Sequence, residues 1–228
     1  MSFTKEDIET YTKNTLKPSD TFSFLCKMCG KCCRNRKEPI LVTGVDVFRI
    51  AKELKMPTAQ VMLEKTRGYV GDQSKLPVAV LKERLDGSCS LLRNGKCMVQ
   101  QNKPTVCALY PLGRMYNSQT KEYSYFTQSS YCQGHQGGKE WTLAEWLNEF
   151  HIDKQNEEET LAWNKLICGL AMVTHGLPDK DLDAVMSLMI DCMYIDYDTS
   201  KTYQEEVERN MIKLQAGFKE LIGKEVKF

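Results

Sequence analysis

The sequence has almost no excess charge and no long hydrophobic run. Its 228 residues include 31 lysines and arginines against 30 aspartates and glutamates, which gives a formal net charge of +1. This balance gives no global reason to expect a nucleic-acid partner or an anionic membrane surface. The longest apolar stretches, such as residues 170–173, are only a few residues long, whereas a bilayer-spanning helix needs about 20. We therefore expect neither nucleic acid nor a membrane as a partner.

Export signals and common cofactor motifs are also missing. The first residues, MSFTKEDIETYTKN, are charged and lack an apolar core, so we expect no secretory signal and predict a cytoplasmic protein. The sequence contains no HExxH, GxGxxG, GxSxG or Walker motif, and it has only three histidines. Without these motifs, the sequence does not predict a zinc protease, a dinucleotide-binding enzyme, a serine hydrolase or a P-loop nucleotidase.

Cysteine is what the chain has in excess. Eight of its ten cysteines lie between residues 26 and 132: Cys26, Cys29, Cys32, Cys33, Cys89, Cys97, Cys107 and Cys132. Because a reducing cytoplasm disfavours disulfides, such a cluster indicates metal ligands in the first place and a bare dithiol redox site in the second. Cys168 and Cys192 stand alone in apolar, helix-like segments, and we predict that they are buried core thiols.

The segment CKMCGKCC, residues 26–33, has a spacing that suits an inorganic centre. The run C-x2-C-x2-C can wrap around a cubane iron–sulfur cluster that a remote thiolate completes, and C-x2-C alone is also typical of tetrahedral zinc sites. In both cases the two-residue gap lets two sulfurs converge while backbone N–H groups point at them. Gly30 can supply the positive φ that such a turn often needs.

The adjacent pair Cys32 and Cys33 indicates more than one centre, because neighbouring side chains usually diverge. We predict that Cys33 binds a second centre, while the first is held by Cys26, Cys29 and Cys32. The sequence leaves open how the other four thiols are distributed. Two further features bear on this site: nearby cations, including Lys27, Lys31 and Arg34, would favour thiolates or are simply solvated, and His135 is an alternative ligand.

Periodicity predicts an α+β fold that changes character near residue 140. Before it, short strands and helices alternate with turns, including a strand at 39–43, a helix capped by Thr43 and a hairpin closed by Asn94-Gly95. After it, a helix capped by Thr142 precedes apolar 3–4 spacing over 157–176, 179–195 and 201–222, which predicts amphipathic helices. We expect a small loop-rich cysteine-cluster region packed on a C-terminal antiparallel helical layer. The predicted divisions are an N-terminal extension (1–23), a metal-binding domain (24–140) and a helical region (141–228).

Several blocks in a fixed order resemble a known family. They are CKMCGKCC, ILVTGVDVFRIAKEL, SCSLLRNGKCMVQQNKPTVCALYP and YCQGHQGGKEWTLAEWL. Together they resemble the YkgJ-type cysteine-cluster proteins, which are described as zinc- or iron-chelating CxxCxxCC domains, and all eight family cysteine positions are filled. The chain departs from the family at Ala108, where arginine is common, and at Gln133, where proline is common. The resemblance implies metal or iron–sulfur binding but no reaction, although flagellin lysine methylases carry a similar cluster.

We predict that the eight cysteines are the ligands of a cofactor or metal, and three hypotheses follow for the function of the protein. The first is a cytoplasmic protein that holds an iron–sulfur cluster, [4Fe–4S] in preference to other types, with a redox or accessory role. The second is a zinc-stapled module that presents a surface to a protein partner. The third is an enzyme that uses a cluster to modify a protein or peptide, which would require an open coordination position.

Overall fold

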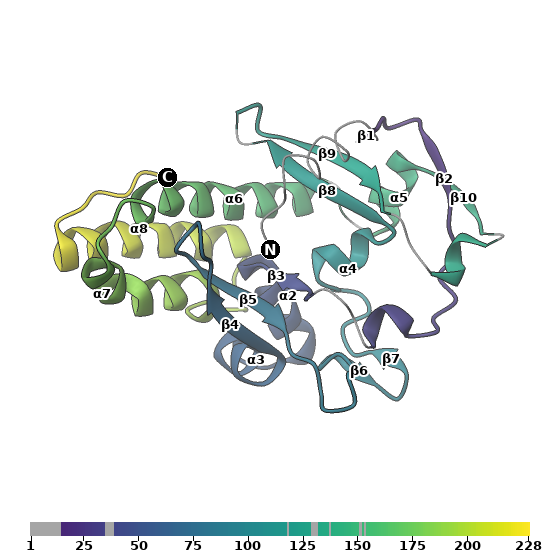
Figure 1. Ribbon diagram of the computed structural model, residues 1–228, viewed down its shortest axis with the longest axis horizontal. Coiled ribbons are helices and arrows are strands. Elements are labelled where there is room, and N and C mark those ends of the chain that lie inside the picture. The colour runs from purple at the N-terminus through teal and green to yellow at the C-terminus, as the bar shows by residue number, and fades with distance from the viewer. Residues whose placement is uncertain are drawn as a thin grey trace. The chain divides into compact units, whose positions relative to one another are not determined.

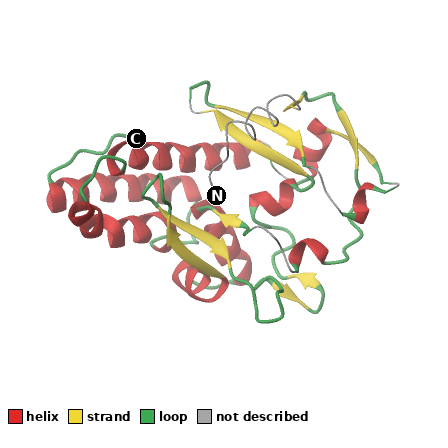
Figure 2. Ribbon diagram, viewed as in Figure 1, coloured by secondary structure: helices red, strands yellow, loops and turns green. Residues whose placement is uncertain are grey.

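The computed structural model describes residues 15–34, 39–117, 119–128, 132–136, 138–150, 152 and 154–228. Its contacts divide the chain into two compact units, each built from two segments. Unit 1 comprises residues 1–32 and 105–157, and unit 2 comprises residues 33–104 and 158–228. Each unit combines helices with short antiparallel strands, which confirms the α+β class (Figures 1 and 2). The division at residues 23 and 140 stays a prediction, and of the proposed N-terminal extension, residues 1–14 lie outside the described residues.

Among its described residues, unit 1 contains two small sheets and two short α-helices. One sheet has the order β1-β9-β8 and the other pairs β10 with β2. The helices are α4 (Thr105–Leu109) and α5 (Leu143–Glu149), and the strands are β1 (Thr15–Leu16), β2 (Thr21–Ser23), β8 (Leu112–Asn117), β9 (Glu122–Thr127) and β10 (Glu140–Thr142). The predicted cap of α5 is confirmed, since Thr142 and Glu145 form a reciprocal capping box.

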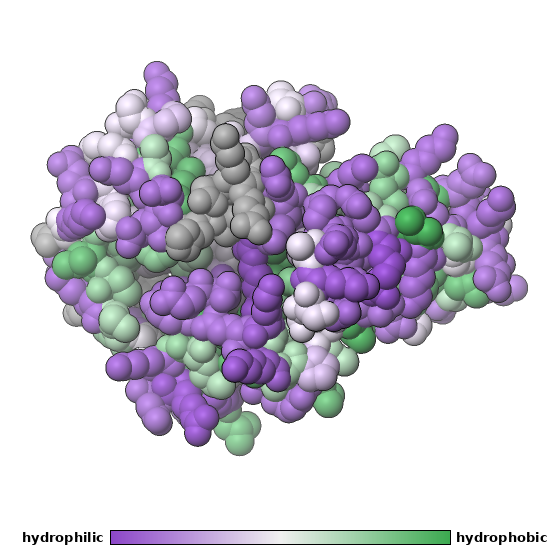
Figure 3. Space-filling model, turned by 180° about the vertical axis from the view of Figure 1, so that it is seen from behind, coloured by the Kyte–Doolittle hydropathy of each residue, from purple (hydrophilic) through white to green (hydrophobic). Residues whose placement is uncertain are grey.

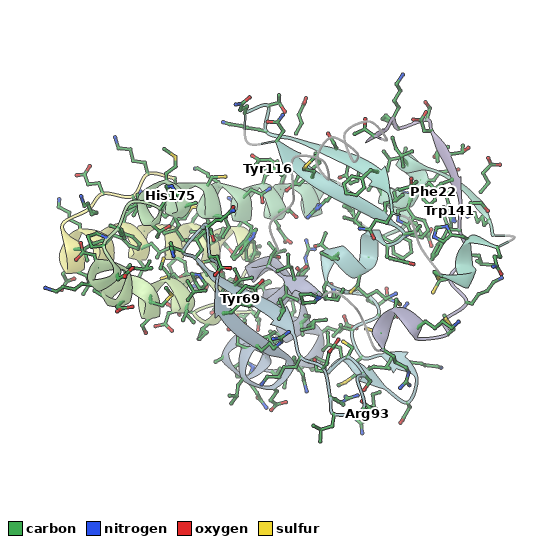
Figure 4. The ribbon with its side chains drawn as sticks, viewed as in Figure 1. Phe22, Tyr69, Arg93, Tyr116, Trp141 and His175 are labelled. Atoms are coloured by element: carbon green, nitrogen blue, oxygen red, sulfur yellow. The ribbon has the colours of Figure 1, made fainter. Side chains whose placement is uncertain are left out.

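A compact aromatic core holds unit 1 together. Its buried members are Phe24, Leu112, Leu143 and Trp146. The Phe24 and Trp146 rings meet edge to face at 5.6 Å, and the Trp146 Nε1–H donates to the Leu109 carbonyl at 3.0 Å. On the paired strands β2 and β10, Phe22 lies opposite Trp141 (Figure 4). Strands of two or three residues can persist here because this core, rather than intrinsic strand propensity, fixes them.

Unit 2 places a three-stranded sheet, a hairpin and most of the helices around one core. The sheet has the order β3-β5-β4, and the hairpin is β6-β7. The strands are β3 (Leu41–Val42), β4 (Thr66–Val70), β5 (Pro77–Leu81), β6 (Leu92–Arg93) and β7 (Lys96–Cys97), and the helices are α2 (Gly44–Leu54), α3 (Thr58–Lys65), α6 (Lys154–Thr174), α7 (Asp179–Ile190), the π-helical turn η3 (Asp191–Ile195) and α8 (Tyr203–Ile222). Within the described residues, every helix is too short or too polar to span a lipid bilayer.

Local sequence signals account for several of these elements. Thr43 caps α2, as predicted, and the Asp46 side chain accepts the Thr43 N–H in return, which completes a capping box. Asn94 and Gly95 both adopt positive φ, at 51° and 75°, which is the geometry that the predicted two-residue hairpin needs. The predicted helix over 179–195 widens into the π-turn η3 near its end. There the Asn210 side-chain amide donates to the carbonyls of Cys192 and Asp196, which supplies partners for backbone groups that the α-helical pattern would not satisfy.

The helical layer buries its apolar face as predicted. Leu166, Val185, Met189 and Leu214 are fully buried and belong to one core with residues of α2 and β5. Polar side chains predominate on the face drawn in Figure 3. Cys192 is fully buried in this core, in agreement with its prediction, and burial raises its pKa to about 11. Cys168 is a free thiol on α6, as predicted, but it is only partly buried, so the predicted place in the buried core is wrong for this residue.

Candidate metal centre

The eight clustered cysteines are shared between the two units. Unit 1 carries Cys26, Cys29, Cys32, Cys107 and Cys132, whereas unit 2 carries Cys33, Cys89 and Cys97. The boundary falls between Cys32 and Cys33, the adjacent pair that we predicted to serve different centres. None of the ten cysteines, all of which lie in the described residues, is joined in a disulfide.

The CKMCGKCC loop is an exposed turn with unusual backbone angles. Met28 and Gly30 adopt positive φ, at 50° and 69°, so the predicted role of Gly30 is confirmed. The Met28 N–H donates to the Cys26 Sγ at 3.4 Å, which is the N–H···S contact that a metal-binding turn requires. Cys26, Cys29 and Cys32 are exposed, and the loop ends in the short 3-10 helix η1 (Lys31–Cys33).

The segment around Cys132 forms a second turn of the same kind. The Gly134 N–H donates to the Cys132 Sγ at 3.4 Å, and the His135 N–H donates to the Cys132 carbonyl at 3.2 Å. Residues Gln133–His135 make the 3-10 helix η2. Cys132 therefore lies directly before the 3-10 helix, and both its sulfur and its carbonyl accept N–H groups of that helix.

Backbone contacts hold this second turn against the first. The Leu25 N–H donates to the Gly134 carbonyl at 2.9 Å, and the Phe24 N–H donates to the Lys139 carbonyl at 2.9 Å. A side chain at Gly134 would not fit, because its Cβ would lie 2.6 Å from the Phe24 ring and 2.9 Å from the Leu25 oxygen. The strand pairing of β2 with β10 thus brings Cys132 to the segment that leads into Cys26, although the two cysteines are far apart in sequence.

Cys107 lies on α4, which the same core anchors. The helix ends at Leu109, whose carbonyl accepts the Trp146 indole N–H. The next residue, Tyr110, packs against Phe24 with 5.8 Å between ring centroids. Cys107 is half-buried in this setting.

In unit 2, three thiols lie around one short loop. The Cys89 N–H donates to the Cys33 carbonyl at 2.8 Å, and Arg34 and Ser88 form an antiparallel bridge beside this contact. The Leu91 N–H donates to the Cys89 Sγ at 3.5 Å. Cys97 follows on β7, directly opposite Leu92 of β6. Cys33 and Cys97 are half-buried against the core that contains Cys89.

The environment of Cys97 disfavours its thiolate in the metal-free state. Burial raises the pKa of the Cys97 thiol above its ordinary value, and the Val99 N–H that hydrogen-bonds the sulfur opposes this effect. The neighbouring Cys89 raises the pKa further, because two thiolates repel each other. A bound cation would relieve both penalties, so this thiol pair suits a metal better than a nucleophilic role.

Arg84 fixes the loop that carries Cys89, and no pattern in the sequence singles this residue out. Its guanidinium donates to the Ser90 carbonyl at 2.9 Å and also to the Leu92 carbonyl, and its backbone N–H donates to the Ser88 carbonyl at 2.7 Å. These bonds hold the peptide of Leu91, whose N–H points at Cys89. No spacing rule could have found this residue, since its role depends on the path of the folded loop.

Taken together, four cysteines share one local geometry. In each, the N–H of the residue two positions later hydrogen-bonds the sulfur, as seen for Cys26, Cys89, Cys97 and Cys132. Such bonds stabilise thiolates and tune the centres that thiolates hold, so this donor set fits a thiolate-bound metal or cluster. Among the described residues, no three Cys, His, Asp or Glu side chains form a group that could already hold a metal ion, so the eight-ligand set stays a prediction.

His135, the alternative ligand suggested by the sequence, also lies in unit 1. Its Nε2 atom is buried and has no hydrogen-bond partner among the described residues. Its ring meets the Phe24 ring edge to face at 5.2 Å.

Comparison with known proteins identifies the cysteine-bearing part of the chain. Residues 25–133 match the family model CxxCxxCC, described as "Putative zinc- or iron-chelating domain". The match begins one residue before Cys26 and ends one residue after Cys132, so it contains all eight clustered cysteines. The comparisons with curated proteins and with solved structures found no match. The family description supports metal binding by zinc or iron, and residues 25–133 of this chain are similar to that family.

Proposed function

We propose that the protein is a cytoplasmic iron–sulfur protein whose clustered cysteines hold [4Fe–4S] centres, with a redox or accessory role. The observation that carries the proposal is the recurrent N–H···S turn at Cys26, Cys89, Cys97 and Cys132, within a segment that matches a zinc- or iron-chelating family. The C-x2-C-x2-C run favours iron–sulfur over zinc, because a cubane takes three thiolates from one loop and one from elsewhere. When bound, such a cluster would supply one-electron transfer or Lewis acidity.

The contacts within each unit support a division of ligands between two centres. Cys26, Cys29 and Cys32 would hold the first centre with Cys132, because the Leu25–Gly134 bond brings the Cys132 turn to the start of that loop. Cys33, Cys89 and Cys97 would contribute to the second, because the Cys89–Cys33 backbone bond and the β6–β7 hairpin bring them to one loop. Cys107 is the eighth thiol, and the part of the EPR signal that is lost in its own serine variant would assign it to a centre. Ten thiols outside disulfides are compatible with a reducing compartment such as the cytoplasm.

A catalytic role is favoured by one observation, the thiol count of unit 2. Three family thiols belong to this unit, and a cubane held by three thiolates has one iron open to an exogenous ligand. Such an iron could bind the substrate of a protein- or peptide-modifying reaction. Cyanide added to the reduced protein would change its electron paramagnetic resonance (EPR) spectrum if an open iron is present, and an unchanged spectrum would favour electron transfer or an accessory role.

The test is metal analysis on protein that is produced and purified without oxygen. We expect a brown protein with a broad absorbance near roughly 400 nm, iron and acid-labile sulfide in equal amounts, and an EPR signal after reduction. Serine variants of Cys26 and Cys132 should lose the same part of the signal, and serine variants of Cys89 and Cys97 should lose the other part. Cys168→Ala and Cys192→Ala are matched controls, since these thiols lie on the C-terminal helices.

Two outcomes would contradict the proposal. A colourless protein with stoichiometric zinc would identify the zinc-stapled module, whose metal is part of its folded state and whose helical surface would then be examined for a protein partner. A protein that binds neither metal, even after anaerobic reconstitution with iron and sulfide, would refute metal binding altogether.

A further inference from the structure

His135 has a buried ring nitrogen that the protein itself does not use. Its Nε2 atom is inaccessible to solvent and lacks a hydrogen-bond partner among the described residues. A buried polar atom that is left unpaired is costly, and most such atoms in folded proteins have a partner. The edge-to-face contact of His135 with Phe24 explains how the ring is held, but it leaves the nitrogen without a partner.

The place of His135 in its turn indicates what the missing partner is. His135 follows Cys132 by three residues, and its N–H closes the 3-10 turn on the Cys132 carbonyl. The Cys132 Sγ accepts the N–H of Gly134, the residue directly before His135, so the sulfur lies at the same short turn as the imidazole. The Phe24 ring that packs on His135 belongs to the segment that leads into Cys26. A centre held by Cys132 and the Cys26 loop would therefore lie close to Nε2.

We propose that His135 donates a hydrogen bond from Nε2 to a sulfur of the centre in unit 1, either the Cys132 thiolate or a bridging sulfide. This inference rests on the proposed function, because the acceptor exists only when the centre is bound. His135 is then a positioning residue: it raises the reduction potential of the centre, because a donor that faces the sulfurs stabilises the more negative, reduced state. It would add a side-chain donor to the two backbone donors already present, the N–H groups of Met28 and Gly134.

The inference makes opposite predictions for the two states of the protein. Without the centre, His135→Phe removes a buried unpaired nitrogen and keeps a ring of similar size against Phe24. We therefore expect the metal-free variant to unfold at the same temperature as the wild type or at a higher one. With the centre bound, the same variant lacks the donor, so its reduction potential should be more negative while its iron and sulfide content is unchanged. A purely structural role for His135 would give the reverse pattern, with lower stability and an unchanged potential.

The experiment measures the midpoint potential of the anaerobically purified wild type, His135→Phe, His135→Gln and the control His175→Gln. His175 lies in unit 2, where its Nδ1 faces the Gln73 carbonyl, so its variant should match the wild type (Figure 4). His135→Gln can still donate from its amide and should recover part of the wild-type potential. In parallel, electron–nuclear double resonance on wild type labelled with [15N]histidine should show a weak nitrogen coupling that His135→Phe abolishes.

The outcomes separate this inference from the proposed function. A wild type with its clusters intact but the same potential in His135→Phe, or no histidine coupling, would overturn the hydrogen bond and leave the iron–sulfur proposal standing. A strong nitrogen coupling, with loss of the centre in both His135→Phe and His135→Gln, would show that His135 is a direct ligand and would also overturn the inference. A wild type without iron fails at the earlier step, and then the proposed function itself is wrong.

Discussion

Replacing Gly134 with alanine should separate the Cys132 turn from the Cys26 loop. The added Cβ would lie 2.6 Å and 3.0 Å from two atoms of the Phe24 ring and 2.9 Å from the Leu25 oxygen. The Leu25 oxygen is a backbone atom and the ring is buried at 3 % exposure, so neither can move without disturbing the aromatic core. Overpacking of this kind typically costs about 1–3 kcal/mol.

That cost should appear in both folding and metal retention. If the strain is relieved by moving the turn, the bond from Leu25 to Gly134 is lost and the fraction of molecules with Cys132 beside the loop falls. A cost of about 1–3 kcal/mol corresponds to a roughly 5- to 140-fold drop in that equilibrium. We expect a lower urea midpoint for the metal-free protein, measured by tryptophan fluorescence, and faster loss of iron to a ferrous chelator.

Gly176 provides a matched control for this experiment. A Cβ at Gly176 meets nothing within 4 Å, and its φ is not in the left-handed region. Gly176→Ala should therefore be neutral or slightly stabilising, by up to about 1 kcal/mol, since alanine restricts the unfolded chain. If Gly134→Ala matches Gly176→Ala in both urea midpoint and chelation rate, the close approach of the two turns plays no part in holding the centre.

Three further predictions follow from single side chains. Arg84→Met should lower the free energy of unfolding by about 1–3 kcal/mol, because the carbonyls around Cys89 lose their donor. During chelation, EPR should then show iron leaving the unit 2 centre first. Arg93 is exposed on the β6–β7 hairpin (Figure 4), so Arg93→Met should change neither the stability nor the order of iron loss. Burial raises the pKa of Cys192 from 9.0 to about 11, so the contribution of the neutral thiol to stability is complete below pH 9 and is lost as pH rises toward 11. Urea titrations over that range should show that Cys192→Ala loses less unfolding free energy than the wild type, by up to about 3 kcal/mol. Equal losses in the two proteins would contradict the raised pKa. Glu206→Gln should cost at least about 1–3 kcal/mol in urea unfolding, because this buried carboxylate pairs with Arg209 at 2.8 Å and accepts the Asp198 N–H at 2.7 Å; an unchanged midpoint would show that the network contributes nothing.

Structural elements that depend only on neighbouring residues could be predicted from the sequence. The capping boxes at Thr43 and Thr142 each need only a residue and a carboxylate three positions on, and both form. The Asn94-Gly95 turn needs two residues that tolerate positive φ, and it closes the predicted hairpin. Gly30 was predictable for the same reason. In these cases a few adjacent residues determine the backbone, so no knowledge of the tertiary fold is required.

The parts of the site that escaped prediction depend on distant partners. Strand β2 has three residues and no apolar alternation, so nothing in it indicates that it pairs with β10, more than a hundred residues later. Yet this pairing carries Cys132 to the Cys26 segment. The same holds for the two units, whose segments alternate along the chain, and for Arg84, whose acceptors are carbonyls of a folded loop. A cysteine pattern can therefore identify the ligands but not which of them meet.

The local geometry of the sulfurs and their assembly into a centre are separate problems for this protein. Each N–H···S bond at Cys26, Cys89 and Cys132 spans only two residues, so a short turn forms it without help from a metal. Bringing several such turns to one point concentrates thiolates, and their mutual repulsion opposes this until a cation is present. Unit 1 reduces the cost for Cys132 by fixing its turn beside Leu25 through backbone bonds. Cys26, Cys29 and Cys32 of the CKMCGKCC loop are exposed, so metal binding has most to contribute there. Loss of metal should therefore loosen this loop before it disturbs the aromatic core around Phe24.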